Sequence, residues 1–139
     1  MQNMLMLNFW NVGYIVTVPI REYFGIFIHF GIVSNRLGTD GYPMVIANSR
    51  NRRGPALVTW TEFTQGLPLK DCYFPSKLHP AQVLANAYAM FGQPYRFLNW
   101  NCECFAKACH GLEPVSTQVQ VGIALAALTG LAVAVAKAS

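Results

Sequence analysis

Residues 95–105 of the chain read Tyr95-Arg96-Phe97-Leu98-Asn99-Trp100-Asn101-Cys102-Glu103-Cys104-Phe105. The first half is aromatic-rich and typical of an extended segment, and Cys102 opens a run to residue 110 that predicts a helix. A thiol at a helix N-terminus meets unpaired backbone N–H groups and the positive end of the helix dipole, and both favour the thiolate. We therefore predict that Cys102 is a nucleophile. The alternative is a small, buried and inert cysteine, which is a common fate of free cysteines.

A single histidine far upstream is the candidate base for this thiol. His29 interrupts the apolar run Ile28-His29-Phe30-Gly31-Ile32-Val33, and a buried imidazole must find polar partners. It is either a core histidine with satisfied hydrogen bonds or an imidazole that faces the start of the cysteine helix. The second interpretation predicts a papain-like thiol enzyme whose histidine precedes its cysteine.

Asn48 is the candidate for the third polar group of such a site. Its side-chain oxygen can accept a hydrogen bond from the imidazole and fix its tautomer without adding charge. Asn48 and Ser49 equally suit a strand end before a turn, so this alternative stays open. Because side chains alternate across a strand, Asn48 is expected to share a face with Ile46 and not with Ala47.

The remaining pattern predicts one α+β domain over residues 1–114, with an antiparallel sheet packed against helices. Strands are expected over residues 13–19, 24–33, 44–49 and 56–60, with turns over 35–43 and 50–54. Residues 61–66 are expected to form a turn. A further helix is expected to begin near Pro80 and to end at Gly92.

Composition excludes several classes of protein. The chain has 139 residues, of which 53% are hydrophobic and 12% charged, so it is not a disordered segment. The net charge is +4, and the basic cluster Arg50, Arg52 and Arg53 suits a solvated loop or contact with anionic headgroups. No nucleic-acid-binding motif accompanies it. The four cysteines lack zinc-site spacing, so we expect no metal and no cofactor. No secretory signal pattern is evident, and we expect reduced cysteines in an intracellular protein.

Residues 115–139 form an apolar C-terminal tail. Within residues 121–136 Thr129 is the sole polar side chain, and sixteen helical residues span about 24 Å, less than the ~30 Å of a bilayer core. Gly122, Ala126 and Gly130 lie four apart and suit close helix contact. Two interpretations stay open. The tail associates with a membrane, or it packs on its own domain or on a second copy in a homo-oligomer.

Three blocks of the chain resemble, in order, the lecithin retinol acyltransferase-like family of the permuted NlpC-type papain-like superfamily. They are Ile28-His29-Phe30-Gly31-Ile32-Val33, Val45-Ile46-Ala47-Asn48-Ser49 and Asn101-Cys102-Glu103-Cys104-Phe105. The resemblance covers roughly residues 13–112 and implies a circularly permuted papain-like fold, with Cys102 as nucleophile and His29 as base. Two positions depart from the family pattern: Ala47 or Asn48 stands where many members carry a second histidine, and Cys104 replaces a further histidine. The tail is similar to the C-terminal anchors of animal members that act on phospholipids.

These observations predict a cysteine-dependent acyltransferase or acyl hydrolase that acts through a thioester on Cys102. Lipid esters or amides are the expected substrates. One alternative is a peptide or peptidoglycan amide hydrolase with the same fold. The other is a catalytically inactive, membrane-associated or oligomerising module.

Overall fold

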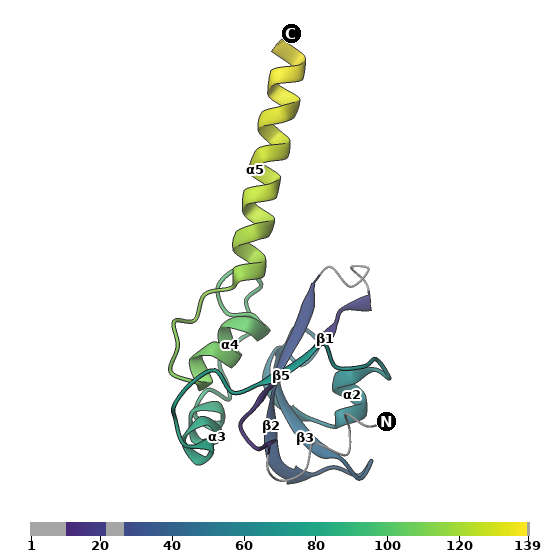
Figure 1. Ribbon diagram of the computed structural model, residues 1–139, viewed down its shortest axis with the longest axis vertical. Coiled ribbons are helices and arrows are strands. Elements are labelled where there is room, and N and C mark those ends of the chain that lie inside the picture. The colour runs from purple at the N-terminus through teal and green to yellow at the C-terminus, as the bar shows by residue number, and fades with distance from the viewer. Residues whose placement is uncertain (1–10, 22–26, 139) are drawn as a thin grey trace.

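The computed structural model describes residues 11–21 and 27–138. For residues 131–133 it describes the backbone alone. It is an α+β structure in which a five-stranded antiparallel sheet packs against helices and a long apolar helix extends from the domain (Figure 1). The predicted fold class is confirmed at this level.

The strands follow the sequence prediction closely, with one addition. They are β1 (Ile15–Pro19), β2 (Ile28–Leu37), β3 (Pro43–Ser49), β4 (Gly54–Val58) and β5 (Asp71–Tyr73), in the sheet order β4-β3-β2-β1-β5. The predicted antiparallel meander is therefore confirmed for the first four strands. Strand β2 runs on through residues 35–37, which were expected to form a turn, and residues 24–26 of the expected strand lie outside the described ranges. Strand β5 was not predicted, because three exposed residues carry no apolar alternation.

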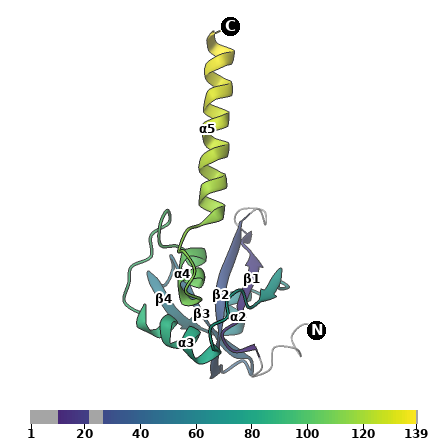
Figure 2. The same cartoon turned by 60° about the vertical axis from the view of Figure 1, so that its left-hand side comes forward.

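Two layers of helices cover the sheet. Helices α3 (Pro80–Ala89) and α4 (Cys102–Cys109) lie on one face, and α2 (Trp60–Thr64) lies on the other (Figures 1 and 2). Helix α2 corrects the expected turn over residues 61–66. Five residues are too few for a visible helical period, but Thr59 caps the helix by accepting a hydrogen bond from the backbone N–H of Glu62.

Strand alternation divides the core into two clusters. Phe30, Ile32 and Ile46 pack with Phe105 of α4, whereas Val45 and Ala47 pack with Phe63 of α2. The expected separation of Ile46 from Ala47 is thus confirmed. At Gly31 a Cβ atom would overlap Cγ1 of Val45 and lie 2.8 Å from Cε2 of Phe63, so glycine leaves room for both side chains on this face of the sheet.

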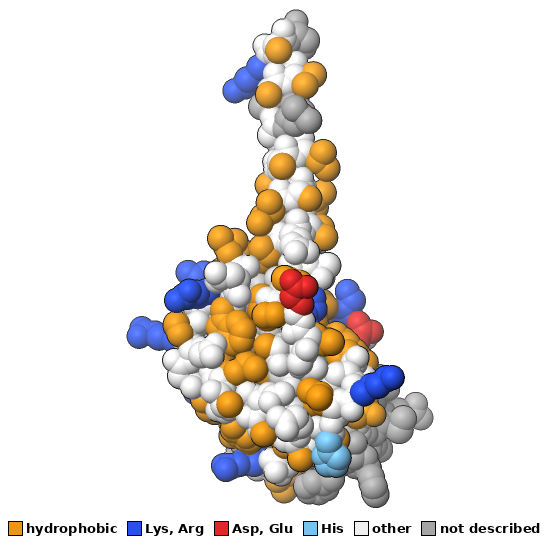
Figure 3. Space-filling model, turned by 90° about the vertical axis from the view of Figure 1, so that its left-hand side faces the viewer, with side chains coloured by type: hydrophobic (Ala, Val, Ile, Leu, Met, Phe, Trp, Pro, Cys, Tyr) orange, Lys and Arg blue, Asp and Glu red, His pale blue; other side chains and the backbone are white. Residues whose placement is uncertain are grey.

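The tail forms helix α5 (Thr117–Ala138), whose 22 residues correspond to about 33 Å. Its 18-residue apolar window has a mean hydropathy of 2.1, and none of that window is buried. Figure 3 shows hydrophobic side chains along the projecting helix. Only the start of the tail therefore contacts the domain, and the length and composition of α5 are sufficient to cross a membrane. The helix is longer than the ~24 Å expected for residues 121–136, since residues 117–120 and 137–138 also belong to it.

Candidate active site

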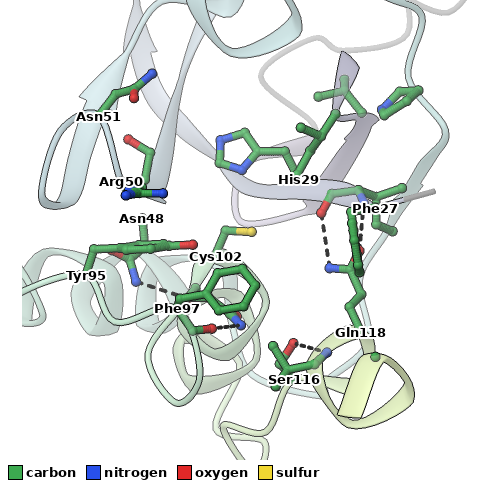
Figure 4. A pocket seen from close by; sticks show the side chains of 18 of the residues that line it. Phe27, His29, Asn48, Arg50, Asn51, Tyr95, Phe97, Cys102, Ser116 and Gln118 are labelled. Carbon is green, nitrogen blue, oxygen red and sulfur yellow. Dashed lines mark hydrogen bonds between the residues drawn. The ribbon is translucent and has the colours of Figure 1, made fainter. Parts of the chain in front are cut away.

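The three sequence-predicted site residues lie around one pocket of about 520 Å³. The pocket is at the end of the sheet where β2 begins and β3 ends, beside the first residues of α4 and α5. Figure 4 shows Cys102 and His29 pointing into this common space. Most of the other lining side chains are apolar, among them Ile20, Phe27, Phe97, Leu98 and Ile123. Such a pocket suits an apolar ligand that carries one reactive polar group.

Cys102 is the first residue of α4, as the sequence predicted, and Asn101 caps the helix. The side-chain oxygen of Asn101 accepts hydrogen bonds of 3.1 Å from the backbone N–H groups of both Glu103 and Cys104. Its Nδ2 donates to the carbonyl of Phe97 at 2.9 Å. Two of the backbone N–H groups at the start of the helix are therefore already occupied. The N–H of Cys102 has no partner inside the helix and is the remaining donor.

The environment of Cys102 favours the neutral thiol. The residue is 7% exposed, and burial raises the pKa of its thiol to about 11, although the backbone N–H of Phe30 acts in the opposite direction. The negative charge of Glu103 raises the pKa further. Burial therefore opposes the expected stabilisation of a thiolate by the helix N-terminus, and desolvation outweighs the nearby N–H groups.

The side chain of His29 lies on the face of the sheet that α2 covers, opposite to α4, and it reaches the pocket from that face. Its ring stacks against Phe63 of α2, with centroids 5.0 Å apart and planes inclined by 30°. Burial lowers the pKa of His29 to about 4, so the imidazole is neutral near physiological pH. No hydrogen bond joins this ring to Cys102 in the described part of the chain. The site thus contains a neutral thiol and a neutral imidazole that face one pocket.

Asn48 does not orient the imidazole as predicted. Its side chain is fully buried, and Nδ2 donates to the carbonyls of Trp100 at 2.7 Å and Asn101 at 3.1 Å. Its Oδ1 has no hydrogen-bond partner among residues 11–21 and 27–138. Asn48 therefore fixes the segment that leads into Cys102. The sequence could not show this, because the bonds connect residues 52 and 53 positions apart.

Glu103, the residue after the candidate nucleophile, has a structural role that the sequence analysis missed. Its carboxylate accepts hydrogen bonds from Ser116 Oγ at 2.8 Å and from the N–H groups of Thr117 and Gln118 at 3.1 and 3.2 Å. Lys107 pairs with it at 3.0 Å. Burial alone raises the pKa of Glu103, but these donors together lower it below its ordinary value. In the sequence, the i,i+4 spacing of Glu103 and Lys107 was the one local feature that indicated this ion pair.

The basic cluster and the other cysteines contribute little to this pocket. Arg50 lines it, whereas Arg52 forms an exposed ion pair with Glu62 at 2.6 Å. Cys104 and Cys109 are buried in the core, and Cys72 is exposed on β5. Over the described ranges, no group of three or more His, Cys, Asp or Glu side chains is arranged to hold a metal ion.

Comparison of the chain with protein-family models, with curated proteins and with solved structures gives no match. Function is therefore inferred from the site.

Proposed function

We propose that the protein is a cysteine-dependent acyl hydrolase or acyltransferase with a permuted papain-like fold, similar to the lecithin retinol acyltransferase-like family. Its substrates are lipid esters or amides, and its intermediate is a thioester on Cys102. The observation that carries the proposal is the position of the Cys102 thiol and the His29 imidazole on one mainly apolar pocket. A helix-start thiol and a strand imidazole are the two groups that acyl transfer through cysteine requires.

At neutral pH the proton starts on the thiol, and its transfer to the imidazole is uphill by about 7 pKa units (11 minus 4), so the transfer is coupled to the attack of the sulfur on the carbonyl carbon. With a pKa of about 4 the imidazole is free to accept a proton, and with a pKa of about 11 the thiol still holds one. His29 takes the thiol proton as the sulfur attacks the carbonyl carbon, and the backbone N–H of Cys102 donates to the developing oxyanion. Collapse forms the thioester, and the departing alcohol or amine takes the proton from His29. Water or an amine then attacks the thioester and gives a proton to His29, the C–S bond breaks, and the Cys102 sulfur takes the proton back from His29.

The apolar lining and the tail support a lipid substrate over a peptide. Val119, Gly122, Ile123 and Ala126, in the first turns of α5, form one wall of the pocket. Phe97 and Leu98 on another wall are 59% and 62% exposed. We propose that α5 associates with a bilayer, which brings the pocket mouth to the lipid surface. An acyl chain would then lie in the apolar pocket, with its ester next to Cys102.

A second function of a different class is also supported by the site. Among the residues that the structure describes, no polar side chain hydrogen-bonds the imidazole: Asn48 bonds elsewhere, and Ala47, on the face that packs against Phe63, has no polar side chain. A neutral, buried thiol with no hydrogen bond to the imidazole is what an inactive protein of this fold would contain. The second candidate is therefore a catalytically silent, membrane-associated module.

Alkylation of the thiols separates the two functions. We would treat the full chain in lipid nanodiscs with iodoacetamide over a pH series and quantify each modified cysteine by mass spectrometry. If His29 activates Cys102, Cys102 reacts faster than the exposed Cys72 near neutral pH, and His29→Ala slows it by about a hundredfold. A short-chain activated ester should also leave an acyl group on Cys102 but not on the Cys102→Ser variant. Slow labelling of Cys102 that does not respond to His29→Ala identifies the silent module.

A further inference from the structure

The side chain of Gln118 pairs with both backbone groups of Ile28. Its Oε1 accepts a hydrogen bond of 2.7 Å from the N–H of Ile28, and its Nε2 donates one of 3.1 Å to the carbonyl. Figure 4 shows Gln118 reaching from α5 to the strand that carries His29. An amide side chain that makes both bonds takes the place of a peptide group from a neighbouring strand.

The register of the sheet explains why no residue of β3 pairs with Ile28. The register of β2 and β3 pairs Ile32 with Ile46, so Arg50 would lie opposite Ile28. Strand β3 ends at Ser49, before it reaches this point. The N–H and carbonyl of Ile28 would then lack a partner on this side, which is unfavourable for partly buried backbone groups. Gln118 supplies that partner one residue before His29.

Glu103, the residue after Cys102, binds the same first turn of α5. The Glu103 carboxylate accepts hydrogen bonds from the N–H groups of Thr117 and Gln118, at the positive end of the α5 dipole. The first turn of the tail helix is therefore bonded both to the residue before His29 and to the residue after Cys102. Beyond this region α5 has no contact that buries its apolar window.

We infer that the first turn of the tail helix is a working part of the site, and that Gln118 is a positioning residue which acts on His29 through Ile28. Its catalytic consequence rests on the proposed function. Glu103 holds Gln118 in place, so the tail does more than attach the domain to a surface. Because the rest of α5 projects from the domain (Figure 1), a change in its direction is transmitted to the start of β2 and to the imidazole.

Two variants of Gln118 and one control test the bonds themselves. Gln118→Ala removes both, Gln118→Glu keeps the acceptor but loses the donor, and Gln120→Ala changes an exposed residue of the same helix that does not line the pocket. In the full chain in nanodiscs, amide exchange of Ile28 should accelerate at least about tenfold in Gln118→Ala and stay unchanged in Gln120→Ala. Unchanged exchange of Ile28 in both Gln118 variants overturns the inference.

The catalytic consequence is tested by the alkylation rate of Cys102. Gln118→Ala should lower the rate near neutral pH by about ten- to a hundredfold, because it displaces the imidazole. In the His29→Ala background the same substitution should have no further effect, since Gln118 acts through His29. An equal loss in both backgrounds overturns the positioning role. If His29→Ala alone leaves the rate unchanged, the proposed function fails, and the exchange of Ile28 alone then decides whether α5 holds the strand.

Discussion

Phe63 stacks on His29 with ring centroids 5.0 Å apart, and it does so from the sheet face opposite to α4. The contact buries the imidazole on the side away from Cys102. It also replaces the hydrogen-bonded third residue of other cysteine–histidine sites with an apolar surface. The orientation of the imidazole therefore depends on packing, and packing can be altered without removing any ionisable group.

Truncating this aromatic ring should raise the pKa of His29. In Phe63→Ala, solvent reaches the imidazole and the pKa should move from about 4 toward the ordinary value of 6.5, since burial causes the shift. We expect the unfolding free energy to fall by about 3 kcal/mol. NMR titration of the His29 ring measures the pKa. Phe63→Leu, which keeps an apolar side chain over the ring, is the control and should shift it less. A pKa that stays near 4 in Phe63→Ala would show that another group buries the imidazole.

Stability should fall as the solution becomes acidic. Burial lowers the pKa values of His29 and His110, so below about pH 6.5 the unfolded chain binds protons that the folded chain does not. The unfolding free energy should therefore decrease from about pH 6.5 to about pH 4, by at most about 3 kcal/mol for His29 alone. Denaturant titrations at several pH values measure this slope.

His29→Ala provides the control for the acid effect. The variant should lose the His29 share of the slope and keep that of His110, whose ring contacts Ser76 at 2.7 Å and the carbonyl of Gly13 at 2.8 Å. Because a carbonyl oxygen only accepts, Nε2 donates to it, and Nδ1 accepts from the Ser76 hydroxyl. A neutral ring therefore satisfies both hydrogen bonds. Stability that is independent of pH over this interval would contradict the neutral state of both histidines in the folded chain.

Substitution of Asn48 should affect the segment before Cys102 and not the imidazole. Asn48→Ala removes the donor to the Trp100 and Asn101 carbonyls and should lower the unfolding free energy by about 1–3 kcal/mol. Asn48→Asp should be more harmful, because a buried carboxylate would face two carbonyl oxygens. In both variants the pKa of His29 should remain near that of the unaltered protein. A shifted His29 pKa with unchanged stability would restore Asn48 as the orienting group.

Charges placed in the middle of α5 should prevent membrane association. Leu125 and Leu128 are 59% and 63% exposed, so their replacement does not disturb the domain. A lysine at the centre of a spanning helix costs about 2.5–3.5 kcal/mol, and the double variant Leu125→Lys, Leu128→Lys should move from liposomes to the soluble fraction in flotation. Gln120→Lys, near the foot of the helix, is the control and should remain bound. A wild-type chain that stays soluble as a stable dimer would instead assign α5 to contact between copies.

Local pattern in the sequence was sufficient for the elements nearest the site. Alternating β-forming residues predicted β1, the turns on either side predicted β3 and β4, and Pro80 marked the start of α3. Asn101 before Cys102 is a preferred helix cap, and α4 begins where the sequence indicated. These features depend on neighbouring residues, whose spacing along the chain is the same before and after folding. Helix α2 and strand β5 escaped prediction because neither is long enough to show its period.

The chemical state of the site depended on contacts between distant parts of the chain. The sequence placed Cys102 at a helix start, but burial among core residues keeps its thiol protonated, and no local pattern encodes that desolvation. Asn48 looked suited to an imidazole, yet its hydrogen bonds go to carbonyls 52 and 53 residues away. The sequence placed Gln118 in the apolar tail without a role, and in the structure it completes the sheet at Ile28, 90 residues earlier. Helix starts and strand faces follow from local sequence, whereas proton affinities and polar partners arise only when folding removes water and brings remote groups together.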